Sequence, residues 1–371
     1  MQKRQRKRER AVLVGIELPD QTMMSLEDSL AELERLVIAA GGETIGRFYQ
    51  SRPKPDGRFY IGKGKAQEVA EFAAKEKADL LVFDDEISPQ QQRHLEEIFK
   101  IKIIDRSKLI LDIFASRAKT REAKLEVELA QLEYLLPRLT RMWEFFSRLG
   151  GGIGTRGPGE TQLEIDRRRV REKISHLKKK IKEVSEHRAL LRSGRRSKGY
   201  ELISLVGYTN AGKSTLLNTL AHENVYVADK PFATLDPVTR QVYLPGLKRK
   251  ALFFDTVGFI QKLPHTLIDS FKATLEEVNH ANILLHVVDV SSSNAKQQIE
   301  AVYRVLEELG AMTKPIVTVL NKIDEVVDKE WVESLKRTYY PAVEVSALKR
   351  TGITELIKMT EEVLSSEGKK I

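Results

Sequence analysis

Short apolar runs and amphipathic segments alternate over residues 11–106. The runs AVLVGIEL, ETIGRFYQ, ADLLVFDD and IKIIDR predict strands. Between them lie SLEDSLAELERLVIAAGG, KGKAQEVAEFAAKEK and SPQQQRHLEEIFK, whose apolar residues recur at helical spacing. Gly41 and Gly42 would end the first of these helices, while Ser88 and Pro89 would start the third. We therefore expect a small α/β domain with a parallel sheet.

Residues 107–198 carry a different pattern, with apolar residues at every third or fourth position as in a coiled-coil seam. The seam positions are Leu125, Leu129, Leu132, Leu136, Leu139, Trp143, Phe146, Leu163, Val170, Ile174, Leu177, Ile181, Val184 and Leu191. We expect two helices of about 28 residues, each roughly 42 Å long, packed as an antiparallel hairpin. Pro137 should kink or split the first helix. A capping box of Thr161 and Glu164 would start the second, leaving the glycine-rich residues 147–161 as the tip.

Strand and helix signals resume after the polar stretch RSGRRSKGY, which predicts a linker. ELISLVGY, RKALFFDTVG, ANILLHVVDV and KPIVTVLNKID are near-continuous apolar runs that each end in polar residues. Such runs suit a parallel sheet covered on both faces, whose ligands bind at the carboxyl ends of the strands. The predicted organisation is a basic tail (1–10), an N-terminal α/β domain (11–106), a helical hairpin (107–198) and a second α/β domain (199–371).

The net charge of +9 has one main source. Residues 167–198 hold 14 Lys and Arg against 3 Glu, so this segment carries +11 and the rest of the chain −2. A concentrated positive charge favours a polyanionic partner such as RNA. The arginine-rich start, residues 3–10, would be a disordered tail that adds nonspecific RNA affinity.

The composition excludes several classes of protein. The chain has no cysteine, which excludes disulfides, thiolate metal sites and cysteine nucleophiles. No apolar run reaches the ~18 residues that span a bilayer, and no signal-peptide pattern follows the basic start. We expect a cytoplasmic monomer with at most peripheral membrane contact.

The strongest chemical motif is GYTNAGKST, which fits G-x-x-x-x-G-K-[ST] between a predicted strand and a predicted helix. In this motif the backbone N–H groups face phosphate, Lys213 reaches the β- and γ-phosphates, and the Ser214 hydroxyl binds Mg²⁺. The predicted nucleotide-binding residues of this P-loop are Gly207, Asn210, Ala211, Gly212, Lys213, Ser214 and Thr215.

Four further motifs follow in order. FATLD offers a second Mg²⁺ hydroxyl at Thr234; DTVG offers Asp255 for Mg²⁺ and the Gly258 N–H for the γ-phosphate. Asp324 of NKID can accept hydrogen bonds from guanine N1–H and its exocyclic amine, and SAL places a backbone N–H at guanine O6. The predicted residues are Phe232, Ala233, Thr234, Leu235, Asp236, Asp255, Thr256, Val257, Gly258, Asn321, Lys322, Ile323, Asp324, Ser346, Ala347 and Leu348. Lys213, Thr234 and Gly258 are the candidate catalytic residues; Ser214, Thr234 and Asp255 are the candidate metal ligands.

These motifs, together with YIGKGK and GGGIGTRGPGETQLEIDRR, resemble the HflX family over nearly the whole chain. The resemblance implies a GTPase that binds GTP and GDP, associates with the large (50S) ribosomal subunit and its rRNA, and splits 70S ribosomes. Phe259 stands where many related GTPases have a water-orienting glutamine, so we expect slow intrinsic hydrolysis that the ribosome stimulates. Gln261, two residues further on, could orient the attacking water only after a rearrangement of this switch segment. Asn210 is a candidate K⁺ ligand, as in related GTPases; the alternative is an ordinary loop asparagine.

The loop GGGIGTRGPGET is a second glycine-rich candidate for phosphate binding, but its flanks are seam helices rather than a strand and a helix. We interpret it as a hairpin tip that carries Arg156 and is backed by Arg167, Arg168 and Arg169, which suit the phosphates and unpaired bases of structured RNA. The alternative is a disordered connector beside a solvated basic face.

Three other functions remain open at this stage. One is an RNA-remodelling, helicase-like NTPase that uses ATP in addition to GTP, with a second nucleotide in the N-terminal domain. Another is a ribosome-assembly GTPase. The third, a tRNA-modification GTPase, would need a methylase-like or cysteine-bearing partner domain.

Overall fold

The computed structural model describes residues 8–19, 25–147, 158–197, 200–222, 231–232, 238–262 and 277–367. Contacts divide the chain into two compact units, Met1–Ser116 with Leu125–Lys180 and Arg117–Lys124 with Ile181–Ile371. Among the described residues, no helix is both long enough and apolar enough to cross a membrane.

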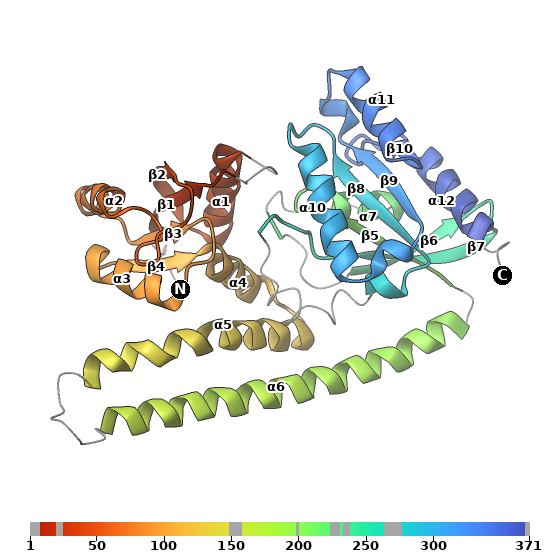
Figure 1. The fold of residues 1–371 in the computed structure, drawn as a ribbon. Helices are drawn as coiled ribbons and strands as arrows, with labels where there is room; N and C mark the ends of the chain where they lie inside the picture. Colours follow the sequence, from red (N-terminus) through yellow and green to blue (C-terminus); the bar gives the residue numbers. More distant parts are fainter. Residues whose placement is uncertain are drawn as a thin grey trace, which may run out of the picture. The chain divides into compact units, whose positions relative to one another are not determined.

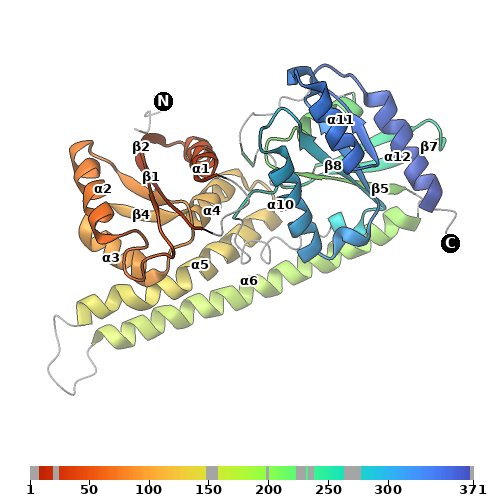
Figure 2. The same cartoon turned by 45° about the horizontal axis from the view of Figure 1, so that its top comes forward.

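The first unit is built on a four-stranded sheet in the order β2-β1-β3-β4, in which all pairs are parallel. Its strands are β1 (Arg10–Glu17), β2 (Glu43–Ser51), β3 (Leu80–Phe83) and β4 (Lys102–Asp105). Its helices are α1 (Leu26–Ala40), α2 (Lys63–Lys75), α3 (Pro89–Phe99) and α4 (Arg106–Arg117). Helices α2 and α3 cover one face of the sheet, and α1 and α4 the other (Figures 1 and 2). The predicted α/β domain with a parallel sheet is confirmed.

Helix α4 was not predicted. Seven of its residues, from Arg106 to Phe114, are buried. Only Lys108 and Asp112 interrupt the buried stretch, so the helical period of its apolar residues is harder to recognise in the sequence.

A hairpin of two long helices follows, α5 (Arg121–Ser147) and α6 (Pro158–Ser197), which run antiparallel (Figure 1). Seam residues Leu129 and Leu177 are 5% and 3% exposed. Ion pairs among the described residues join the helices beside the seam, Lys173 to Glu128 at 2.6 Å and Lys178 to Glu133 at 2.8 Å. The predicted antiparallel packing is confirmed over this stretch.

The hairpin differs from the prediction in its details. Of the two outcomes predicted at Pro137, a kink or a split, the split is excluded, because helix α5 continues through this residue. The neighbouring Arg138 donates to the Tyr134 carbonyl at 3.0 Å and supports this turn from the side. Helix α6 begins at Pro158 rather than Thr161, because proline suits the first helical position. The same helix continues to Ser197, so most of the stretch expected as a linker is helical.

The second unit holds a six-stranded sheet in the order β10-β9-β8-β5-β7-β6. Its strands are β5 (Glu201–Gly207), β6 (Val238–Leu244), β7 (Arg249–Asp255), β8 (Ile283–Asp289), β9 (Ile316–Asn321) and β10 (Ala342–Glu344). Five strands are parallel, whereas β6, which was not predicted, pairs antiparallel with β7 at the sheet edge.

Helices cover both faces of this sheet. They are α7 (Lys213–Leu220), α10 (Ala295–Glu308), α11 (Lys329–Thr338) and α12 (Ile353–Glu367), with short 3-10 turns at Ala311–Thr313 and Ile323–Glu325. Side chains of α7 and α12 share one core with the sheet, and those of α10 and α11 share the other. The carboxyl ends of β5, β7, β9 and β10 carry the predicted motifs.

Candidate nucleotide-binding site

The P-loop connects the end of β5 to the start of α7. Gly212, which caps α7, has a φ of 94°, and a Cβ added there would lie 2.3 Å from Asn321 Nδ2. A Cβ added at Gly207 would lie 2.2 Å from the Val287 carbonyl oxygen. Both positions therefore need glycine, as the motif predicts.

Lys213 lies beneath this loop and is 6% exposed. Its Nζ donates to the carbonyl oxygens of Gly207 at 2.9 Å and Tyr208 at 2.8 Å. An ammonium group has three donors, so one remains for a phosphate oxygen. Burial lowers the pKa of Lys213 to about 8, and nearby Asp255 partly opposes that shift.

Ser214 and Asp255 meet beside the lysine. The Ser214 hydroxyl donates to Asp255 Oδ2 at 2.5 Å, and Asp255 is 1% exposed. Hydroxyl and carboxylate oxygens are the ligands that Mg²⁺ prefers, so this pair fits the predicted metal ligands. Gly258 also lies close, since a Cβ added there would lie 3.0 Å from Lys213 Nζ.

The residues after Gly258 pair with the P-loop backbone. The Phe259 N–H donates to the Gly207 carbonyl at 3.1 Å, and the Thr209 N–H donates to the Phe259 carbonyl at 2.7 Å. The Phe259 side chain is 2% exposed. Phe259 is therefore buried against the loop and presents no group that could orient a water molecule.

The base-recognition motifs are tied to the P-loop through Asn321. Its Nδ2 donates to the Ala211 carbonyl at 2.8 Å, and its Oδ1 accepts from the Ala347 N–H at 3.0 Å. Lys322 is held by an ion pair with Asp289 at 2.6 Å, and Asp324 is exposed. One asparagine therefore holds the phosphate loop and the SAL motif together.

The structure brings Lys213, Ser214 and Asp255 together and joins Asn321 to the P-loop and the SAL motif, whereas some other predicted residues cannot be placed. Phe232 is 2% exposed. The residues 233–236, including Thr234, lie outside the described part of the chain, as does Arg156. On α6, Arg168 and Arg169 are 72% and 71% exposed and pair with Glu172 and Asp166 at 3.7 and 3.8 Å, while Arg167 is partly buried.

Two contributors to the site were missed. Asp289 ends β8 and holds Lys322; its signal was an acidic residue at the end of the apolar run ANILLHVVDV. Tyr208 accepts a hydrogen bond on its hydroxyl from the Gln261 N–H at 2.9 Å. That contact joins residues 53 positions apart, and no local pattern marks it.

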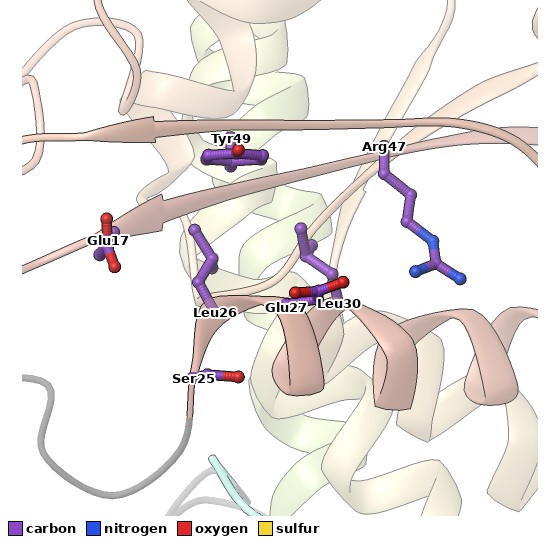
Figure 3. A pocket seen from close by; sticks show the side chains of 7 residues that line it. All are labelled: Glu17, Ser25, Leu26, Glu27, Leu30, Arg47 and Tyr49. Atoms are coloured by element: carbon purple, nitrogen blue, oxygen red, sulfur yellow. The ribbon is translucent and has the colours of Figure 1, made fainter.

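The first unit has a separate pocket of about 480 Å³ between α1 and β2 (Figure 3). It is lined by Glu17, Ser25, Leu26, Glu27, Leu30, Arg47 and Tyr49. The one guanidinium among these residues, Arg47, forms an ion pair with Glu34. Two carboxylates at the pocket, Glu17 and Glu27, would repel a polyphosphate.

Known proteins match this chain along most of its length. Three family models fit in succession, described as GTP-binding GTPase N-terminal (27–115), GTP-binding GTPase Middle Region (117–195) and 50S ribosome-binding GTPase (202–322). The GTPase HflX of Caldanaerobacter subterraneus subsp. tengcongensis is 46% identical, over 99% of this chain and 83% of the relative. The chain belongs to the HflX GTPase family. It is therefore a GTPase.

Other relatives agree with this assignment. The GTPase HflX of Escherichia coli (strain K12) is 44% identical, over 97% of this chain and 84% of the relative. The crystal structure of the SsGBP and GDP complex is 25% identical and matches with a TM-score of 0.50, covering 96% of this chain and 99% of that one. The HflX assignment and the α/β fold with a P-loop domain are thus both confirmed.

Proposed function

We propose that this HflX-family chain binds GTP at the P-loop with Mg²⁺, associates with the large ribosomal subunit and its rRNA, and separates 70S ribosomes into subunits. The observation that carries the nucleotide part is the contact of Asn321 with both the P-loop and the SAL motif. That contact brings the phosphate and base motifs into one site.

The main residues of the site have separate roles in this proposal. Lys213 would give its remaining N–H to a β- or γ-phosphate oxygen, and the Gly258 N–H would meet the γ-phosphate. Asp324 would accept from the guanine N1–H and amine, which adenine does not offer in that arrangement, and Asn321 and the stem of Lys322 would support the guanine ring. Ser214 and Asp255, with Thr234, would hold Mg²⁺, which when bound neutralises charge developing on the phosphates.

Hydrolysis by the free protein should be slow, because Phe259 cannot align the attacking water. We propose that the ribosome supplies the missing alignment. Asn210, exposed in the P-loop with a φ of 64°, is a proposed K⁺ ligand. Equal ribosome-stimulated rates in K⁺ and Na⁺ would exclude that role.

The ribosome part of the proposal is supported by the family and by charge. The matched P-loop family is described as a 50S ribosome-binding GTPase. Helix α6 contributes most of the basic segment 167–198, and its Arg168 and Arg169 are well exposed. Together with Arg156 and Arg167, they are proposed RNA contacts.

Two alternatives predict different behaviour. A helicase-like protein with ATP in the N-terminal domain gains no support from the pocket of Figure 3, whose carboxylates disfavour polyphosphate. A ribosome-assembly GTPase would bind precursor subunits and leave mature 70S ribosomes intact.

Sedimentation of mature 70S ribosomes through a sucrose gradient distinguishes these functions. With the protein and a non-hydrolysable GTP analogue we expect free 50S and 30S peaks. Two controls should leave the 70S peak unchanged. One is the wild-type protein with ATP in place of the analogue, and the other is the Lys213→Ala variant with the GTP analogue. Intact 70S ribosomes at saturating wild-type protein would contradict ribosome splitting.

A further inference from the structure

Beyond β7, the chain stays paired with the P-loop. Tyr208 and Phe259 form a parallel bridge, held by the two backbone hydrogen bonds described above. Phe259 and Ile260 are each 2% exposed, and Gln261 is 8% exposed. The segment from Gly258 to Gln261 is therefore packed into the unit as an extension of the sheet.

The side chain of Tyr208 binds the far end of this extension. Tyr208 is 4% exposed, and its hydroxyl accepts from the Gln261 N–H at 2.9 Å. The hydrogen bond connects the second residue of the P-loop motif to the last buried residue before the charged, exposed Lys262. It holds the backbone of Gln261 to the nucleotide loop two residues beyond Phe259, whose N–H and carbonyl form the backbone hydrogen bonds described above.

Gln261 is also the one side chain in the buried run 259–261 that could orient a water molecule, since Phe259 and Ile260 are apolar. In this conformation its backbone is tied to Tyr208 and its side chain is buried. Use of its carboxamide in hydrolysis would therefore require the segment to open.

We propose that the Tyr208 hydroxyl is a latch that holds Gln261 in a closed, nonproductive position, so that hydrolysis waits until a partner opens the segment. Tyr208 is then a positioning residue that acts through Gln261. This inference rests on the proposed GTPase reaction. In it, the hydrogen bond between Tyr208 and Gln261 contributes to the slow GTP hydrolysis of the free protein.

The latch can be weakened without disturbing the packing. Tyr208→Phe keeps the buried ring but removes the oxygen that accepts the Gln261 N–H. Loss of one buried hydrogen bond shifts a two-state equilibrium by about three- to tenfold. The open conformation should become more populated by that factor.

Single-turnover GTP hydrolysis without ribosomes measures this change. We expect Tyr208→Phe to hydrolyse GTP three- to tenfold faster than wild type, with GDP affinity within twofold. Tyr243→Phe, which changes an exposed tyrosine on β6, is the matched control and should behave as wild type. An unchanged or slower rate in Tyr208→Phe would overturn the latch. Wild-type protein that fails to hydrolyse GTP even with ribosomes would instead refute the proposed function.

Two further measurements address the role of Gln261. Hydrogen–deuterium exchange at the amides of 259–261 should be faster in Tyr208→Phe, and equal exchange would contradict the latch. The double variant Tyr208→Phe/Gln261→Ala should lose the gain in rate. Persistence of the gain would show that the latch does not act through Gln261.

Discussion

Burial of the Lys213 ammonium should make nucleotide affinity depend on pH. The pKa of Lys213 is about 8 in the free site, because burial disfavours the charged form. Bound phosphates favour the charged form and raise that pKa, so binding is fully supported below pH 8. As the pH rises from 8 towards the higher pKa of the complex, affinity should fall by up to about tenfold per unit.

Titration calorimetry of GDP binding at pH 7, 8 and 9 measures this dependence. The dissociation constant should rise mainly between pH 8 and 9. Binding at pH 9 should also take up protons, which appears as a dependence of the heat on the buffer. An affinity that stays constant from pH 7 to 9 would contradict the lowered pKa.

At the residue scale, the sequence predicted the positions that serve a local motif. Gly212 and Ser214 could be assigned because a phosphate loop demands their residue types at fixed spacing. The contacts of Tyr208 with Gln261 and of Lys322 with Asp289 could not, because they join residues 53 and 33 positions apart. Such pairs depend on the sheet order, which the strand patterns leave open.

At the scale of elements, Arg138 anchors helix α5 to the first unit. Its guanidinium donates to Asp105 at 3.0 Å, to the Ile87 carbonyl at 2.9 Å and to Gln92 at 3.1 Å, and it stacks on the Tyr134 ring at 3.5 Å. Asp105 is fully buried at the end of β4. Burial raises the pKa of Asp105, while Arg138 opposes that shift.

Arg138→Ala should therefore destabilise the protein by about 3 kcal/mol, because it leaves a buried carboxylate without its ion-pair partner. The loss should be larger at pH 8 than at pH 5, since protonation of Asp105 at lower pH relieves the unpaired charge. Urea unfolding of the full chain at both pH values measures the effect.

The matched control is Arg93→Ala, which removes a partly exposed ion pair with Glu97 within α3. Such pairs contribute at most about 1 kcal/mol, so this variant should stay near wild type. Equal losses in the two variants would contradict the anchoring role of Arg138.

Helices whose apolar residues recur with a clear period could be predicted from the sequence. Helix boundaries that depend on tertiary contacts could not. The Ser88 capping box appears in α3 where the local sequence placed that helix start. Pro137 suggested a break in α5, but helix pairing and the Arg138 contacts outweigh the lost backbone hydrogen bond. Gly194 suggested a linker, yet the cost of a helical glycine is only about 1 kcal/mol, and α6 runs through it.

For the whole molecule, we expect changes in the hairpin tip to affect ribosome stimulation but not nucleotide binding. Arg156→Ala, or shortening Gly150–Gly154, should leave GTP affinity nearly unchanged, because the site contacts described here lie on other segments. The same changes should abolish ribosome stimulation of GTP hydrolysis if the tip contacts RNA. Fluorescent-nucleotide binding and ribosome-dependent phosphate release measure the two effects. A collapse of GTP affinity would place the tip in the nucleotide site instead.

Helix α6 belongs to both compact units, with residues up to Lys180 in the first and those from Ile181 in the second. Its 40 residues form one unbroken helix of roughly 60 Å. Only residues 198–200 separate its end from β5, the strand that leads into the P-loop. The boundary between the two compact units therefore falls inside a hydrogen-bonded helix rather than in a loop.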